Sequence, residues 1–492
     1  MEWELKISLS GVSLMALNFE VKMPTEFRVE KDSMGEMKIP SQFLYGASTQ
    51  RAVLNFPVSD LRFNRDFIRV LAIIKASCAE VNQKLGKLDA KVADAILKAS
   101  KEIADGKHDA HFVLDIFQTG SGTSTNMNFN EVAANVANLA VGSTVGSKKP
   151  VHPNDHVNMG QSSNDIIPTA IHVAAAVATK ERLIPALQGL EKTLGQKAKA
   201  FDKIVKTGRT HLQDATPIRL GQEFSGYENQ VKKSVERIER ALEPIYELAV
   251  GGTAVGTGIN TDAQFGKLVA ENLKKKLALP FKEAENHFEA QASKDGCVEL
   301  SGALRATAVA LTKVANDLRW LSSGPRCGIG EITLPATQPG SSIMPGKVNP
   351  VIPESLLQVC AQVQGNDLAV ALGGQAGNFE LNVMMPLIAH NLLESIQILA
   401  NGVKMFDEKC VVGLEANIRK IEETVEKSLM LATPLAPVVG YDKAAEISKK
   451  AFAENKTVRE IASATLDLSK DKLDEILDVS GMTVPGAGGG GE

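Results

Sequence analysis

Residues 224–245 read FSGYENQVKKSVERIERALEPI and decide the fold class. Apolar side chains recur there every three or four positions, and Lys, Glu and Arg fill most of the positions between them. This spacing keeps one face of a helix apolar over about 30 Å. The apolar set is Phe224, Tyr227, Val231, Val235, Ile238, Leu242 and Ile245.

Two further stretches, 183–201 and 300–321, carry the same spacing. Aromatic residues make up only 5% of the 492 residues, which favours packing of helix on helix over a β-sandwich or barrel. We therefore expect an all-α, mainly helical protein, in which a long central helical bundle joins smaller N- and C-terminal domains.

The chain is too long for one compact core, so we expect several domains. Turn-rich text at 118–125 and 151–158 predicts loops between short helices in the first part of the chain. The predicted divisions are an N-terminal extension at 1–26, an N-terminal domain at 27–162, the central bundle at 163–418, a small helical C-terminal domain at 419–482 and a disordered Gly-rich tail at 483–492.

Charge and cysteine content narrow the classes of function. The net charge is −4, from 54 basic and 58 acidic residues, so no basic excess favours nucleic acid or a membrane surface. The five cysteines are scattered without a CxxC pair, which predicts a reducing compartment and no metal site. No apolar run of about 18 residues is present, so we expect no transmembrane helix. With the cysteine pattern of a reducing compartment, we expect a cytoplasmic protein.

Five segments hold small polar donors where helical periodicity asks for Leu or Val: 119–130, 152–155, 160–165, 208–217 and 340–350. Gly-rich text before a helix favours anion binding, because free N–H groups and the positive end of the helix dipole meet there. Taken alone, segments 119–130, 152–155 and 208–217 are also explained by helix capping, an Asx-type turn and a structural histidine, respectively. In segment 160–165, capping explains one of the three consecutive side-chain donors, Ser162, Ser163 and Asn164, but not all three.

The fifth segment, GSSIMPGKVNP, favours function over structure. Gly340, Gly346 and the proline between them permit tight turns, and the remaining residues supply two hydroxyls, a lysine cation and an amide within eleven positions. No packing requirement explains that set.

On these residues the chain resembles the fumarase/aspartase superfamily, and the resemblance runs from about residue 27 to about residue 480. GSSIMPGKVNP resembles the family signature, and the other four segments follow in the family's order. Gly346, His211 and Thr216, with GNFELNV at 377–383 and GYDKAAEI at 440–447, resemble the fumarase branch more than the aspartase branch. One departure is VIPESL at 351–356, although it retains Glu354.

The resemblance implies reversible hydration of fumarate to L-malate, a tricarboxylic acid cycle reaction, through an aci-carboxylate intermediate and without metal or cofactor. Aspartate ammonia-lyase is the alternative activity, and a helical scaffold without activity is a third reading. The implied catalytic residues are Ser341 as the base, His211 on the hydroxyl side and Glu354 as its partner.

The resemblance also implies the substrate contacts and the assembly. The expected substrate-binding residues are Ser121, Gly122, Thr123, Asn126, Ser162, Ser163, Asn164, Thr210, Ser342, Lys347, Val348 and Asn349. A second dicarboxylate site would comprise His152, Pro153, Asn154 and Asp155. Each active site would draw on three chains of a homotetramer, with the Ser121 and Ser163 regions, His211 and the Ser341 loop coming from different chains.

Overall fold

The computed structural model describes residues 26–485 and is mainly helical, as the sequence predicts. The predictions for residues 1–25 and 486–492 lie outside the described residues. No helix within 26–485 is both long and apolar enough to cross a membrane.

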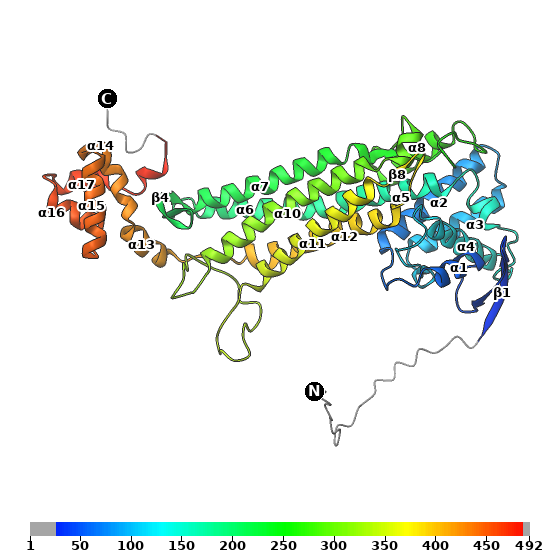
Figure 1. Ribbon diagram of the computed structural model, residues 1–492, viewed down its shortest axis with the longest axis horizontal. Coiled ribbons are helices and arrows are strands. Elements are labelled where there is room, and N and C mark those ends of the chain that lie inside the picture. The colour runs from blue at the N-terminus through cyan, green and yellow to red at the C-terminus, as the bar shows by residue number, and fades with distance from the viewer. Residues whose placement is uncertain (1–25, 486–492) are drawn as a thin grey trace, which may run out of the picture.

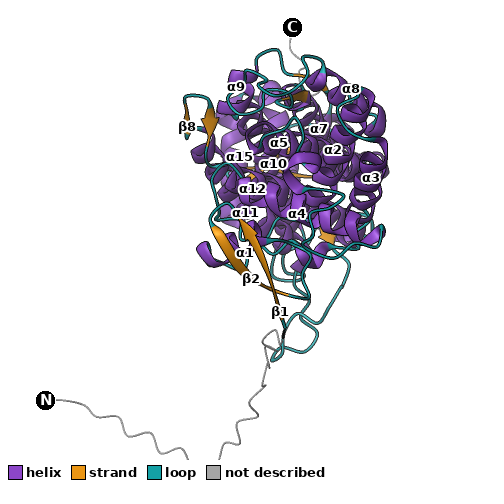
Figure 2. Cartoon of the chain, turned by 90° about the vertical axis from the view of Figure 1, so that its right-hand side faces the viewer, coloured by secondary structure: helices purple, strands orange, loops and turns teal. Residues whose placement is uncertain are grey.

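The first part of the chain gathers its helices at one end of the molecule (Figure 1). An antiparallel hairpin precedes them, with Phe27 paired to Pro40, and it lies beside α1 (Figure 2). The elements are β1 (Phe27–Asp32), β2 (Gly35–Pro40), α1 (Ala47–Asn55), α2 (Arg65–Lys84), α3 (Ala90–Ala104), η1 (Asp109–His111), α4 (Thr123–Ala140) and η2 (Pro153–Val157). The sequence predicts short helices here, but α2, α3 and α4 are 20, 15 and 18 residues long.

The central part contains the long helices, which run side by side (Figure 1). Most of each predicted apolar stripe falls on one of three helices, α6 (Ile184–Ala200), α7 (Leu220–Ala241) and α10 (Asp295–Leu321). Leu183 and Phe201 lie just outside α6, and Leu242 and Ile245 lie beyond the end of α7. The other long helices are α5 (Ser163–Ala178), α11 (Val351–Gly374) and α12 (Met385–Phe406). Shorter helical elements are η3 (Thr179–Leu183), η4 (Pro244–Tyr246), α8 (Phe265–Leu277), α9 (His287–Ala292) and η5 (Asp407–Val411).

Short pairs of strands lie at the ends of this bundle. The longest is the antiparallel hairpin of β3 (Val205–Thr210) and β4 (Gln213–Arg219), which joins α6 to α7. The remaining strands are two residues each: β5 (Glu247–Leu248), β6 (Lys282–Glu283), β7 (Ile332–Thr333), β8 (Gly377–Asn378), β9 (Leu381–Asn382) and β10 (Glu415–Ala416).

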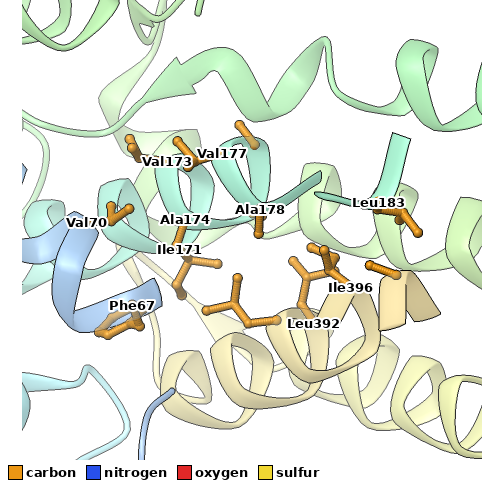
Figure 3. Packing of buried hydrophobic residues seen from close by; sticks show 14 of the residues in the cluster. Phe67, Val70, Ile171, Val173, Ala174, Val177, Ala178, Leu183, Leu392 and Ile396 are labelled. Atoms are coloured by element: carbon orange, nitrogen blue, oxygen red, sulfur yellow. The ribbon is translucent and has the colours of Figure 1, made fainter. Parts of the chain in front are cut away.

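Small side chains set the helix spacing in the core. Between α2, α5 and α12, aliphatic and aromatic side chains fill the space around an alanine-rich face of α5, and all of them are 4% exposed or less. Because alanines permit close approach, a larger side chain at Ala174 would force its neighbours apart. Figure 3 shows Phe67 and Val70 of α2 near Ile171 and Ala174 of α5, with Leu392 and Ile396 of α12 further along the same cluster.

The C-terminal helices enclose a separate buried cluster that includes Leu431, Leu435 and Ile447. The elements are α13 (Ile418–Lys427), η6 (Leu429–Leu435), α14 (Ala436–Val439), α15 (Tyr441–Glu454), α16 (Val458–Thr465), α17 (Lys470–Ile476) and η7 (Gly481–Thr483). The domain boundaries drawn from the sequence stay predictions.

The prediction of a loop over 151–158 is wrong for most of that segment. Residues 153–157 form a single wide helical turn, η2, with Pro153 at its first position. The imidazole of His152 caps the turn, because its Nδ1 accepts from the N–H groups of Asn154 at 3.2 Å and Asp155 at 3.1 Å. A proline suits the first position of a helical turn, where its missing N–H costs nothing.

Candidate active site

The predicted site residues divide between two ends of the bundle. Ser341, Lys347 and Asn349 precede α11, whose 24 residues span about 35 Å. The far end of α11 leads into β8 and β9, and there Met385 N donates to the carbonyl of Gly120 at 3.0 Å. Within one chain, the loop before α11 is therefore about a helix length from the residues around Ser121 (Figure 1).

Three hydroxyl groups form a chain at the starts of α4 and α5. Ser121 Oγ lies 2.7 Å from Thr123 Oγ1, which lies 2.6 Å from Ser163 Oγ. Ser121 and Ser163 are each 8% exposed. The two helix starts thus place their hydroxyls together, where free N–H groups and both helix dipoles favour an anion.

Glycines make this close approach possible. Gly122 takes the left-handed conformation, φ +71°, at the start of α4, and a Cβ there would lie 2.9 Å from Ile167 of α5. At Gly120 a Cβ would lie 1.8 Å from the carbonyl oxygen of Val383. Any larger residue at Gly120 would push the α4 start away from β9.

The start of α5 uses its polar residues in different ways. Ser162 caps the helix by accepting from Asn164 N at 3.2 Å, and Asp165 accepts from Ser162 N at 2.9 Å in a capping box. Asn164 Nδ2 donates to Ala254 O at 2.8 Å. Of the three donors predicted from the sequence, only Ser163 joins the hydroxyl chain, and capping accounts for the Ser162 side chain.

Asp165 is fully buried beneath this site. Its second carboxylate oxygen accepts from the N–H groups of Gly251 at 3.1 Å and Thr253 at 3.0 Å. Burial raises the pKa of Asp165 to about 6, although these N–H donors favour the carboxylate form. The carboxylate therefore ties the loop after η4 to the first turn of α5.

At the other end of the bundle, His211 occupies the tip of the β3–β4 hairpin. Thr210 pairs with Gln213, which leaves His211 and Leu212 as a two-residue turn with φ of +56° and +58°. Such turns favour Asn and Gly, and side chains like His and Leu are strained there. Backbone strain of this kind persists where the surroundings hold it and is frequent at functional sites.

A buried ion cluster anchors the hairpin. Glu331 is fully buried and accepts from Arg209 Nη2 at 2.8 Å, and Lys206 Nζ lies 3.2 Å from its other oxygen. Lys206 is 1% exposed. Removing one member of such a cluster leaves a buried charge without its partner. Because Glu331 directly precedes β7, the cluster links the His211 hairpin to the segment that leads into the 340–350 loop.

The two ends of the 340–350 loop are joined by hydrogen bonds, and most of the loop is exposed to solvent. Gly340 N donates to Lys347 O at 2.9 Å, and Asn349 Nδ2 donates to Gly340 O at 2.7 Å. Ile343 is 83% exposed, and Ser342, Lys347 and Val348 are exposed as well. A Cβ on Gly340 would lie 2.3 Å from Lys347 O, so this position requires glycine.

The Ser341 hydroxyl already receives two backbone donors. Its Oγ accepts from Ile343 N at 3.2 Å and from Met344 N at 3.0 Å. N–H groups aimed at an oxygen stabilise negative charge on it. The loop backbone therefore favours the deprotonated form of this hydroxyl.

Glu354 does not contact His211 within the described residues of one chain. It lies in the first turn of α11, 4.0 Å from Arg319 Nη2. A surface hollow of about 630 Å³ is lined by Glu354 and Arg319 together with Lys347, Asn349 and Leu212. The structure thus brings the hairpin tip, the loop and Glu354 to one hollow, while the roles predicted for these residues stay predictions.

The predicted second dicarboxylate set is contiguous on η2. His152 Nδ1 accepts two backbone N–H groups, so its proton belongs on Nε2, and the 3.3 Å approach to Asp155 is a contact rather than an ion pair. Burial lowers the pKa of His152, in agreement with a neutral ring. Asn154 and Asp155 are exposed, whereas Pro153 is buried.

Sequence reasoning missed several residues that hold the site in place. Glu331 gives no signal in the sequence, because only its distant partners explain it. Lys75 does give one, since it stands within the apolar run VLAIIKASC at a position that helical spacing assigns to the core. Its ammonium group and the side-chain amide of Asn126 both donate to the side-chain oxygen of Asn158.

Comparisons with known proteins point to one family. A family model described as "Lyase" matches residues 35–365, and a model described as "Fumarase C C-terminus" matches residues 431–484. A fumarate hydratase class II of Corynebacterium glutamicum is 53% identical over 463 residues, which cover 93% of this chain and 96% of that protein. One of Nitrosomonas europaea is 51% identical over 458 residues, with 93% and 99% covered.

A solved structure agrees with these matches. The crystal structure of recombinant class II fumarase from Schistosoma mansoni superposes with a TM-score of 0.90 at 44% identity, covering 94% of this chain and all of that one. The likeness therefore extends over nearly the whole chain and includes both ends of the bundle.

Proposed function

Because the chain belongs to the class II fumarate hydratases of the fumarase/aspartase lyase family, we propose that it hydrates fumarate to L-malate by acid–base catalysis at the residues described above. It is a hydro-lyase. The hydroxyl chain of Ser121, Thr123 and Ser163 at two helix starts is the observation that carries the substrate assignment, because it offers clustered neutral donors to a carboxylate.

The charge of the intermediate explains the need for many donors. In the direction from L-malate, a proton leaves carbon beside an anionic carboxylate, and the resulting aci-carboxylate holds a third negative charge. Donors that are already in place stabilise this charge without reorganisation. We assign that role to the helix starts, with Gly122, Asn126, Asn164 and Thr210, and to the loop groups Ser342, Lys347, Val348 and Asn349.

Ser341 acts as the base on the carbon proton. A serine hydroxyl is a poor base in water, so its alkoxide form must be stabilised. The N–H groups of Ile343 and Met344, which already donate to Oγ, supply part of that stabilisation. Closure of the exposed loop over the substrate would exclude water and strengthen these interactions.

His211 acts on the opposite side, giving a proton to the hydroxyl group that leaves from L-malate. Histidine suits this step because its ordinary pKa lies near neutral pH. Glu354 orients the imidazole. Since Glu354 and His211 do not touch in one chain, we place this contact between subunits.

The active sites are shared among chains of a homotetramer. The separation of about 35 Å between the loop and the helix starts supports this, since one chain alone leaves each half incomplete. Exposed apolar side chains on the long helices support it too, because such faces are covered in a stable protein. They are Val309 and Trp320 on α10 and Leu368 and Leu372 on α11.

Three further parts of the proposal concern the surroundings of the reaction. The substrates are fumarate and L-malate, and the location is the cytoplasm. A second dicarboxylate binds at His152, Pro153, Asn154 and Asp155. No cofactor or metal takes part.

The test is a steady-state assay with L-malate in the presence of a metal chelator, followed at the ultraviolet absorbance of fumarate. We expect fumarate to appear, and to disappear again when water adds in the reverse assay. Release of ammonia from aspartate without turnover of L-malate would contradict the proposal and favour aspartate ammonia-lyase instead.

A further inference from the structure

A lysine is buried directly behind the candidate substrate site. Lys75 lies on α2 and is fully buried, yet its ammonium group has a side-chain oxygen as partner: Nζ donates to Asn158 Oδ1 at 2.9 Å. The same oxygen accepts from Asn126 Nδ2 at 3.1 Å and from Asn130 Nδ2 at 3.2 Å. Three donors from α2 and α4 thus meet on one carbonyl oxygen.

This arrangement fixes how each carboxamide is turned. An ammonium group can only donate, so Asn158 must direct its oxygen toward Lys75. Its Nδ2 then faces the other way and donates to Gln161 O at 3.1 Å. Asn126 and Asn130 must in turn direct their NH₂ groups toward that oxygen, because a flipped amide would set two oxygens against each other.

These amide orientations leave two side-chain oxygens without a hydrogen-bond donor. The side-chain oxygens of Asn126 and Asn130 are buried and have no hydrogen-bond partner among residues 26–485. Buried polar atoms without partners are costly, so a donor such as a substrate hydroxyl or a water is expected to complete the group. Asn126 is 2% exposed and lies one turn after Thr123 of the hydroxyl chain.

Among residues 26–485, no acidic side chain forms a salt bridge with Lys75. Asp165 on α5 acts on it through space, and Cys78 on α2 is its other titratable neighbour. Burial lowers the pKa of Lys75 to about 7, and burial raises the pKa of Cys78 to about 12. A buried cation of this kind is stabilised when an anion binds nearby, because screening by solvent is weak inside a protein.

We propose that Lys75 is a positioning residue of the dicarboxylate site, which sets the orientation of the Asn126 carboxamide through the side-chain oxygen of Asn158. The inference rests on the proposed function, because Asn126 is assigned to the substrate there. Lys75 does not touch the substrate itself. It acts by ordering an amide that does.

The main test is a double-mutant cycle on L-malate turnover. Lys75→Met keeps the side-chain length and removes the donor, and we expect kcat/KM to fall about tenfold, as for loss of one hydrogen bond to a charged group. Asn126→Ala should cause a similar fall, and the double variant should be no worse than either single one. Losses that multiply, or a Lys75→Met enzyme equal to wild type, would overturn the proposal.

A matched control separates this role from the general effect of a buried lysine. Lys294 is 1% exposed, and its Nζ donates to the carbonyls of Ala290 and Ser293 within its own segment. Lys294→Met should leave kcat/KM within about twofold of wild type. An equal loss in both lysine variants would mean that burial alone, and not the link to Asn126, explains the effect.

The pH dependence gives a second readout. The charge of Lys75 is present below its pKa of about 7 and is lost as the pH rises. The ratio of kcat/KM between wild type and Lys75→Met should therefore be larger at pH 6.5 than at pH 9. Asp165, with a pKa of about 6, stays mainly ionised over this range. A ratio that does not change with pH would contradict the role of the charge.

If the Lys75→Met variant does not assemble, two substitutions of Asn158 test the same proposal. Asn158→Asp keeps an oxygen acceptor for all three donors and should retain most activity, whereas Asn158→Leu removes it and should lose about tenfold. Equal activities would overturn the proposal. Wild-type enzyme that fails to turn over L-malate would instead sink the proposed function, so the two failures are distinguishable.

Discussion

The two ends of the bundle differ in how complete they are. At the starts of α4 and α5, Ser121, Thr123 and Ser163 are packed together, hydrogen-bonded and largely withdrawn from solvent. At the other end, the loop of Ser341 and the His211 turn are exposed. The first half of the candidate site is built into the fold, whereas the second half is exposed to solvent in one chain.

This difference has a physical origin. The first turn of a helix has free backbone N–H donors at fixed positions. An anion site at two helix starts therefore needs only that the two starts pack closely, which Gly120 and Gly122 allow. The Ser341 hydroxyl, as the proposed base, has a different requirement: water must be excluded when it acts, because water would protonate its alkoxide form. An exposed loop that closes on its substrate meets both needs, admitting the substrate first and excluding water afterwards.

The largest effect is expected at the exposed end. Ser341→Ala removes the proposed base, and we expect kcat for L-malate to fall by about 10³-fold or more. The unfolding temperature should stay within about 1 °C, because the side chain is not packed in the core. Steady-state kinetics and calorimetry on the same preparation measure both, and activity within a few-fold of wild type would remove Ser341 as the base.

A smaller loss is expected for His211→Asn, about 10²-fold in kcat. Asparagine tolerates positive φ better than histidine does, so the turn should keep its shape and the protein should be equally or slightly more stable. This separates chemistry from hairpin structure. If activity is retained, another group must serve the hydroxyl side.

Thr123→Val tests the built-in end. It removes the middle hydroxyl of the chain while keeping the side-chain shape, and we expect about a tenfold rise in KM with a smaller change in kcat. The isosteric change should not expose the loop or alter the oligomer. An unchanged KM for both fumarate and L-malate would mean that the hydroxyl chain serves the fold rather than the substrate.

One substitution made at both ends compares their rigidity directly. Gly120→Ala would place a Cβ 1.8 Å from Val383 O, so we expect a loss of several kcal/mol in the free energy of unfolding. Gly346→Ala meets no atom within 4 Å, and its φ of +80° costs only about 1 kcal/mol. Chemical denaturation measures both. Equal losses would show that the two ends do not differ in packing.

Much of the fold could be predicted because one face of each long helix meets the core. Because the opposite face meets solvent, apolar and polar residues alternate with helical spacing in α6, α7 and α10. On α11 the outer face carries Leu368 and Leu372, so polar and apolar positions do not separate and periodicity gives no signal. The β3–β4 hairpin was not predicted either, because Lys206 sits at a buried position that only distant Glu331 makes acceptable.

The residues of the candidate site could be named from the sequence, whereas their division between chains was expected only from the family resemblance. Nothing in the order of the motifs says that Ser163 and Ser341 lie at opposite ends of a bundle, because helix direction decides it. The duty of Ser162 as a cap and the link from Lys75 to Asn126 also depend on contacts between segments that periodicity does not connect.

The claim that sites are shared between chains is tested most directly by complementation. Two impaired variants, Ser341→Ala and the double variant Thr123→Val with Ser163→Ala, are produced together with different tags. Mixed oligomers are purified through both tags and assayed, beside each parent, at L-malate concentrations below KM. If the loop and the helix starts of each site come from different chains, about a quarter of the sites in random mixtures regain both intact halves. Activity at that level is the predicted result. Mixed oligomers as inactive as their parents would contradict the account, because each site would then be built from one chain.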